Sequence, residues 1–235
     1  ATNAITGIAT AYMDSIPMVV ISGQVPRDKI GEDAFQETDM VGISRPIVKH
    51  SFQVKHASEI PGMMRKAFYL ASSGRPGPVV IDIPKDVQNW AGTYQGSGLL
   101  PVRGYHARMQ AMRSHTLDDD HAAKFFQMLG EAERPLIVAG GGIINADASD
   151  LLVELAELTG VPVIPTLMGW GTIPDDHPLM AGMVGLQTSH RYGNATMLAS
   201  DFVLGIGNRW ANRHTGSPEV YCKGRSFVHV DIEPT

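Results

Sequence analysis

Residues 78–84 read Pro-Val-Val-Ile-Asp-Ile-Pro, a nearly unbroken run of apolar residues between two prolines. Such a run, without polar alternation, is typical of a strand covered on both faces, as in a parallel sheet. The residues before it predict a helix, because six of them form one apolar stripe: Ile60, Met63, Met64, Ala67, Phe68 and Ala71. Gly74 follows, where a helix commonly ends. A helix that leads into a buried strand predicts an α/β fold.

The same alternation recurs along the chain. We expect further strands at 18–21, 136–139, 161–165, 202–206 and 227–232, the first of them buried, and helices at 4–12, 121–129, 147–158 and 191–199. In the helix at 121–129 we expect four residues to point inward: Ala122, Phe125, Phe126 and Leu129. The helix at 147–158 carries Leu151, Leu152, Leu155 and Leu158. Strands alternating with helices predict the class α/β, with parallel sheets flanked by helices.

Periodicity fails between about residues 88 and 117, where Gly92, Gly96, Gly98 and Pro101 cluster. A segment of this length without a pattern is long for a loop inside one domain. We therefore expect a linker at 91–117 between a first domain at 1–90 and a second at 118–235.

Composition restricts the function. The 235 residues carry a net charge of −5 and no basic run, which argues against a nucleic-acid surface. A single cysteine, Cys222, rules out an internal disulfide and fits a reducing compartment. No apolar run approaches the roughly 20 residues that span a bilayer, and no signal peptide is visible, so we expect a cytoplasmic protein without a membrane partner.

Four expected strand ends in the second domain carry short or flexible sequence: 140–142, 166–169, 207–209 and 231–232. In a parallel sheet these ends share one edge, where glycines admit a ligand and an acid such as Asp231 can hold ribose hydroxyls. Arg209 and Arg213 can neutralise a pyrophosphate, although surface ion pairs would also explain them, as a helix cap would explain Asp231. The pattern predicts a dinucleotide site. No Gly-x-Gly-x-x-Gly follows a strand, which disfavours an ordinary NAD dehydrogenase.

Several long motifs identify a family. Residues 23–26, 33–36, 73–78 and 84–86 resemble acetolactate (acetohydroxyacid) synthase large subunits, which are thiamine-diphosphate enzymes that carry FAD. Residues 139–148, 165–171, 182–188 and 205–209 are more similar to the sister enzyme glyoxylate carboligase (tartronate-semialdehyde synthase). The chain departs from the synthases at Val184, where they usually have His, and at Ala211 and Asn212, where they usually have two Asp.

The resemblance implies a fold and a reaction. The first domain would be the C-terminal half of a pyrimidine-binding domain, and the second a Rossmann-like central FAD domain, incomplete at its end. The parent enzyme would decarboxylate a 2-oxoacid and join the two-carbon unit to a second carbonyl compound, as in branched-chain amino acid biosynthesis, with glyoxylate carboligase and a non-catalytic flavin-binding or nucleotide-binding module as alternatives. It would act as a homo-oligomer, a dimer or tetramer, with a possible regulatory subunit.

The resemblance also implies site residues. Phe35 and Gln36 would lie beside the thiamine and the substrate, and Lys85 at the channel to the thiazolium. A core position, a loop-stabilising amide and a solvated turn are their respective alternatives. The flavin would be contacted by Arg75, Gly140, Gly141, Gly142, Thr166, Leu167, Met168, Gly182, Met183, Val184, Gly185, Gly207, Asn208, Arg209, Arg213, Asp231 and Ile232.

Two parts of the thiamine site are expected outside the chain. The family's glutamate for the aminopyrimidine would lie before Ala1, and its magnesium-binding segment after Thr235. Both ends are expected to be cut, since Ala1-Thr2-Asn3 would continue a longer family motif. The chain alone would then be inactive, and it supplies no metal ligands of its own.

Overall fold

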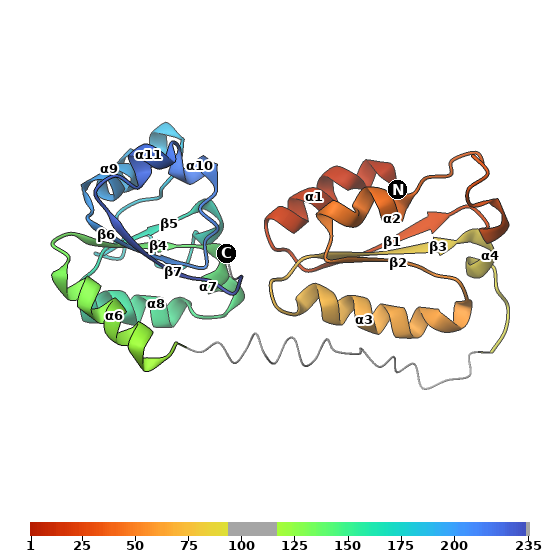
Figure 1. Cartoon of the computed structure of the whole chain (residues 1–235), viewed down its shortest axis with the longest axis horizontal. Coiled ribbons are helices and arrows are strands. Elements are labelled where there is room, and N and C mark those ends of the chain that lie inside the picture. The colour runs from red at the N-terminus through yellow and green to blue at the C-terminus, as the bar shows by residue number, and fades with distance from the viewer. Residues whose placement is uncertain (94–116, 234–235) are drawn as a thin grey trace. The chain divides into compact units, whose positions relative to one another are not determined.

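The computed structural model describes residues 1–93 and 117–233. It divides into two compact units, Ala1–His115 and Thr116–Thr235. The expected linker at 91–117 lies, apart from its ends, outside the described residues. Each unit is a parallel sheet between helices (Figure 1).

The first unit is built on a three-stranded sheet in the order β1-β3-β2, with all strands parallel. The strands are β1 (Met18–Gln24), β2 (His50–Gln53) and β3 (Pro78–Pro84). Helices α1 (Ile5–Met13) and α2 (Met40–Ser44) pack on one face, and α3 (Ile60–Ser72) on the other. Every residue of β3 is buried, as its apolar sequence predicts for a strand in the middle of a covered sheet.

The second unit has a four-stranded parallel sheet in the order β5-β4-β6-β7. The strands are β4 (Pro135–Ala139), β5 (Val163–Pro165), β6 (Phe202–Ile206) and β7 (Ser226–Val230). Helices α6 (Asp119–Glu131) and α8 (Ser149–Thr159) cover one face. The other face carries α9 (Arg191–Ala199), α10 (Asn212–Thr215) and α11 (Pro218–Tyr221).

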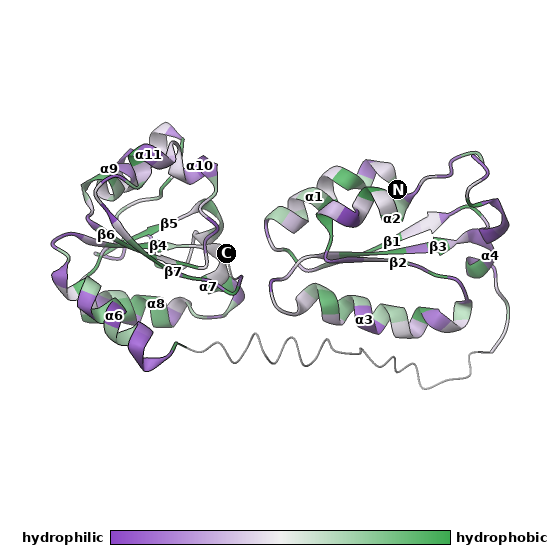
Figure 2. Ribbon diagram, in the orientation of Figure 1, coloured by the Kyte–Doolittle hydropathy of each residue, from purple (hydrophilic) through white to green (hydrophobic). Residues whose placement is uncertain are grey.

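Two short α-helices begin where strands end: α4 (Lys85–Gln88) after β3, and α7 (Gly141–Asn145) after β4. Six 3₁₀ turns complete the described elements: Thr2–Ala4, Arg27–Lys29, Arg45–Ile47, Ala57–Glu59, Leu167–Gly169 and Thr188–His190. Figure 2 shows hydrophobic colouring along the central strands and mixed colouring along α3 and α6. In residues 1–93 and 117–233, no helix combines the length and the apolar character needed to cross a bilayer.

The parallel α/β class is confirmed, but several expectations of burial are wrong. Met18 and Ile21 are 36% and 57% exposed, because β1 lies at the edge of its sheet. Four residues from the apolar patterns of the expected helices are also largely exposed: Phe68, Phe126, Leu151 and Leu158. An apolar stripe is wider than the line of contact with a flat sheet, so only part of each stripe is covered. In α8 that part is Leu152 and Ala156, and in α3 it includes Ala67, Leu70 and Ala71.

Candidate functional site

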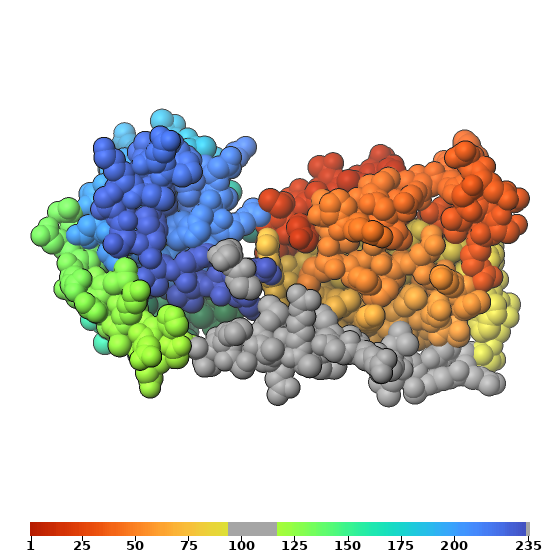
Figure 3. Space-filling model, viewed as in Figure 1, coloured from red at the N-terminus to blue at the C-terminus, as the bar shows by residue number. Residues whose placement is uncertain are grey.

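The carboxyl edge of the first sheet carries a long loop between β1 and α2, residues 25–39. Its two ends meet at one side chain. The amide of Gln24 donates through Nε2 to the Thr38 carbonyl at 2.6 Å and accepts from the Val25 N–H through Oε1 at 2.9 Å. Arg27 forms a further tie, donating through Nε to Asp86 Oδ2 at 2.6 Å, so the start of the loop is joined to α4. The loop forms the orange projection at one end of the first unit (Figure 3).

Inside this loop, the Glu37 carboxylate accepts the backbone N–H groups of Gly31 and Ala34. These two bonds hold the pKa of Glu37 below its ordinary value, since they stabilise the charged form. Asp39 then accepts the Gly42 N–H at 2.8 Å and caps α2. The conformation of the loop is therefore stabilised by its own acidic side chains, which accept hydrogen bonds from nearby backbone N–H groups.

The structure brings the three expected catalytic residues to this edge. Phe35 is 90% exposed, and Gln36, also exposed, has a left-handed backbone with φ of 63°. Lys85 opens α4 directly after β3 and is exposed. Its neighbour Asp86 holds Arg27, and this arginine keeps the pKa of Asp86 below its ordinary value. Phe35, Gln36 and Lys85 are thus all exposed on segments that follow the carboxyl ends of β1 and β3.

In the second unit, the glycines at the carboxyl edge serve close backbone packing. A Cβ on Gly140 would lie 2.1 Å from the Gly207 carbonyl oxygen, and one on Gly142 would lie 2.6 Å from Gly207 Cα. The Gly142 N–H donates to the Gly207 carbonyl at 2.9 Å. Gly207 itself has φ of 60°, which favours glycine. The turns after β4 and β6 therefore touch through backbone alone.

The other expected flavin residues of this unit fall into two groups. Leu167, Met168 and Ile232 are 65%, 43% and 53% exposed, and Arg209 and Arg213 are exposed as well. The Asp231 side chain is only 19% exposed and lies 3.7 Å from His229 Nε2. Thr166, Val184 and Asn208 are buried, at 7%, 2% and 5% exposure. Asn208 Oδ1 accepts a hydrogen bond from the Trp210 N–H at 3.2 Å, so this side chain already has a partner within the protein. These three buried residues could therefore offer a ligand only their backbone atoms.

The segment 182–185 lies against the start of α9. A Cβ on Gly193 would be 2.4 Å from the Met183 carbonyl oxygen, and Gly182 has φ of 89°. The Val184 N–H donates to the Pro165 carbonyl at 3.1 Å, which ties the segment to the end of β5. This links it to the carboxyl edge of the second sheet. Arg75 belongs to the first unit, where its Nε donates to Ser15 Oγ at 2.9 Å.

Sequence reasoning missed several residues that organise these edges. Asp82 is fully buried and accepts from both Ser22 and Gln24, and Asn194 binds the backbone of Gly185. A signal existed for Asp82, because it is the one charged residue in the apolar run 78–84. Nothing local in the sequence pointed to Asn194.

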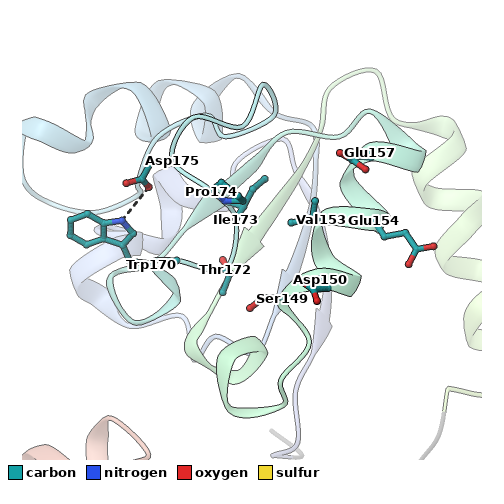
Figure 4. Close-up of a pocket in the computed structure, with 11 residues that line it drawn as sticks. Ser149, Asp150, Val153, Glu154, Glu157, Trp170, Thr172, Ile173, Pro174 and Asp175 are labelled. Atoms are coloured by element: carbon teal, nitrogen blue, oxygen red, sulfur yellow. Dashed lines mark hydrogen bonds between the residues drawn. The ribbon is translucent and has the colours of Figure 1, made fainter.

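A pocket of about 580 Å³ lies between α8 and residues 170–175 (Figure 4). Asp150, Glu154 and Glu157 line it from α8, and Asp175 lines it from the facing loop, where it accepts from Trp170 Nε1 at 3.2 Å. No lysine or arginine is among its described lining residues. Because this surface is acidic, it disfavours an anionic ligand and does not suit a nucleotide. In the described parts of the chain, no group of three His, Cys, Asp or Glu side chains is arranged to hold a metal ion.

Comparison with protein families gives two matches. Residues 122–235 match the model described as "Thiamine pyrophosphate enzyme, central domain". Residues 1–43 match "Thiamine pyrophosphate enzyme, N-terminal TPP binding domain".

Curated relatives match over the entire chain. Glyoxylate carboligase of Escherichia coli O157:H7 is 53% identical over 234 residues, which is 100% of this chain and 38% of the relative. An acetolactate synthase large subunit of Haemophilus influenzae is 46% identical over 237 residues, covering 100% of this chain and 40% of the relative. A probable acetolactate synthase large subunit of Methanocaldococcus jannaschii is 44% identical, with 100% and 39% covered. The chain thus spans about two fifths of the length of these relatives.

Proposed function

Since the chain belongs to the thiamine pyrophosphate enzyme family, we propose that it forms part of a carboligase. This enzyme would decarboxylate a 2-oxoacid and condense the resulting two-carbon unit with a second carbonyl compound. The observation that carries the proposal is the identity of 53% to a glyoxylate carboligase and 46% to an acetolactate synthase across the whole chain. Both relatives are named for joining carbon units, so the reaction class is common to the two.

Between the two, the higher identity favours glyoxylate as the donor substrate. The second candidate function is that of an acetolactate synthase, with pyruvate as the donor and a role in branched-chain amino acid biosynthesis. It is supported by the loop motif at 33–36 and by identity of 43% to 48% to synthases from several organisms.

The proposal gives roles to the first unit's edge. Thiamine diphosphate, when bound, supplies the carbanion chemistry that breaks and makes the carbon–carbon bonds. Phe35 provides an apolar wall that keeps water from the substrate carboxylate. The Gln36 amide donates a hydrogen bond to a carboxylate or carbonyl oxygen without titrating. Lys85 attracts the anionic substrate to the entrance. The exposure of all three side chains supports these roles.

We also propose that the carboxyl edge of the second sheet binds FAD, as a structural rather than a redox group. Exposed Leu167, Met168 and Ile232 offer apolar surface for a flavin ring, and Arg209 and Arg213 offer positive charge for a pyrophosphate. The partly exposed Gly141 and Gly142 leave backbone accessible there. Gly140, Val184 and Asn208 are buried, so their part would be to shape the edge.

Other parts of the proposal concern the whole protein. Magnesium would accompany the diphosphate, and we assign it no residue of this chain. A homo-oligomer is supported by the apolar surface of Met18 and Ile21 at the sheet edge. A regulatory subunit is supported only by the name "large subunit" given to the synthases.

The test is a donor assay on the full-length protein with thiamine diphosphate, magnesium and FAD. Glyoxylate and pyruvate are offered separately, and tartronate semialdehyde and acetolactate are measured together with released CO₂. We expect turnover of glyoxylate at least about ten-fold faster than of pyruvate. Faster turnover of pyruvate would favour acetolactate synthase. Turnover of neither, in protein that binds FAD, would instead support a non-catalytic flavin-binding module.

A further inference from the structure

Asp82 is a buried carboxylate on β3 whose two oxygens are both occupied by side chains of β1. Ser22 Oγ donates to Oδ1 at 2.6 Å, and Gln24 Nε2 donates to Oδ2 at 3.1 Å. Ser22 is the register partner of Asp82 across the parallel pair, and Gln24, two residues further along β1, lies on the same face. Asp82 is 0% exposed.

Stability alone does not explain this carboxylate. Burying an acidic side chain costs stability, and an apolar residue of similar size usually serves a core equally well. The other residues of 78–84 are all apolar and buried. Two neutral donors from β1 are the observed partners of Asp82.

The orientation of Gln24 depends on this carboxylate. An amide nitrogen has two N–H groups, and both are used: one on Asp82 Oδ2 and one on the Thr38 carbonyl. The amide oxygen is then left facing the Val25 N–H, from which it accepts. All three bonds require the same orientation of the amide. Gln24 can therefore bind both ends of the loop, at Val25 and Thr38, only while an acceptor such as Asp82 binds its other N–H.

We propose that Asp82 is a positioning residue, which acts through Gln24 to hold the 25–39 loop and its Phe35–Gln36 pair in place for the substrate. The inference deepens the proposed function and, for the role of Phe35 and Gln36, rests on it. Asp82 itself touches no substrate, because it is buried beneath the edge. Its contribution is to fix a side chain that would otherwise have several rotamers.

Three variants of the chain separate this role from ordinary core stability. Asp82→Asn keeps an acceptor for Gln24, because its amide nitrogen can donate to the Ser22 hydroxyl instead. Ser22→Ala removes the lateral bond and leaves the Gln24 bond. The double variant Ser22→Ala/Asp82→Val removes the acceptor and the hydroxyl that would be left unpaired, and a β-branched residue suits a buried strand.

The first measurement is amide hydrogen exchange on the 235-residue chain. In the double variant we expect the amides of 25–38 to exchange about ten-fold faster or more, whereas those of β3 keep their wild-type rates. Asp82→Asn and Ser22→Ala should stay within about three-fold of wild type throughout. The proposal is overturned if the loop of the double variant exchanges as slowly as wild type, or if β3 accelerates equally.

The second measurement is steady-state kinetics of the same variants in the full-length protein. The double variant should lose about ten-fold or more in kcat/KM, and Asp82→Asn should retain most of it. If the exchange result holds and the kinetic loss is absent, the loop is positioned as described but is not used in catalysis. That outcome would overturn the role of Phe35 and Gln36, and with it the functional half of the proposal, without affecting the choice between donors.

Discussion

Asn194 holds Gly185 by both of its backbone groups. The Gly185 N–H donates to Asn194 Oδ1 at 3.1 Å, and Asn194 Nδ2 donates to the Gly185 carbonyl at 2.6 Å. One side chain of α9 thus fixes the end of the 182–185 segment, much as a neighbouring strand would. Gly185 is itself crowded, because a Cβ there would lie 2.4 Å from His190 Nδ1.

Asn194→Ala should lower the free energy of unfolding by about 1–2 kcal/mol, because it leaves two partly buried backbone groups without their partner. Asn194→Asp should also cost stability, since it keeps the acceptor for the Gly185 N–H but places a second oxygen against the Gly185 carbonyl, where the amide nitrogen donated. Urea denaturation measures both. Thr196→Ala is the control, because its hydroxyl only bonds the exposed Tyr192 carbonyl one turn back in the same helix. An equal loss in the Thr196 variant would contradict the assignment.

Gly140→Ala should destabilise the second unit by about 2–4 kcal/mol, because the new methyl group would meet the Gly207 backbone, which cannot move aside easily. Gly130→Ala is the matched control. Nothing lies within 4 Å of a Cβ at that helical position, so this change should stabilise the protein by about 0.5–1 kcal/mol. Thermal unfolding of the two variants should therefore shift in opposite directions, and a shift in the same direction would argue against the packing described.

Arg225 joins the end of α9 to the segment after α11. Its Nε and Nη2 donate to the carbonyls of Met197 and Leu198 at 2.9 and 2.6 Å, and its Nη1 donates to the Tyr221 carbonyl at 2.8 Å. A lysine cannot reproduce this fork, so Arg225→Lys should cost about 2 kcal/mol in chemical denaturation. Lys223→Ala, on the exposed surface nearby, should cost under about 0.5 kcal/mol. If Arg225→Lys costs as little as Lys223→Ala, the positive charge rather than the fork is what stabilises this region.

His214 should make stability depend on pH. Burial, with the positive charge of Arg209 nearby, lowers the pKa of His214 to about 4, against an ordinary value of 6.5. Between these values the unfolded chain binds more protons than the folded one. The free energy of unfolding therefore falls as the pH drops from 6.5 towards 4, by up to about 3 kcal/mol.

The comparison with His214→Phe isolates this effect. Glu37, Asp86, Asp118 and Asp201 also have lowered pKa values and also reduce stability in acid, but they are shared by both proteins. Unfolding curves at pH 7.5, 6, 5 and 4.5 give the difference between wild type and variant. We expect the free energy of unfolding of wild type to fall steadily, relative to that of the variant, as the pH drops below 6.5. A difference that stays constant over this range would disprove the assignment.

Elements with strong local patterns were predicted well. The expected helix at 191–199 and strand at 202–206 coincide with α9 and β6, and the run 78–84 coincides with β3. Gly160, which directly follows α8, has φ of 67°, a left-handed conformation in which glycine commonly ends a helix. These predictions succeed because an internal parallel strand needs apolar side chains on both faces, whatever its neighbours are.

Other elements had no such pattern. β2 reads His-Ser-Phe-Gln and was missed, because a strand at the sheet edge needs little apolar sequence. The helix α7 begins within the glycines that were expected to form a loop, and the turns around α10 and α11 were not anticipated. The expected site residues were found from motifs, so the sequence could suggest their chemistry but not which of them would be buried.

The amino-acid sequence by itself determined the alternation of strands and helices and the kinship with thiamine pyrophosphate enzymes. Only the tertiary structure decided which side of each apolar helix is covered, and that Asp82 and Gln24, 58 residues apart, share a hydrogen bond. The physical reason is that local spacing fixes the direction of a side chain relative to its own backbone. Its partners depend on the register and order of strands that meet only when the chain has folded.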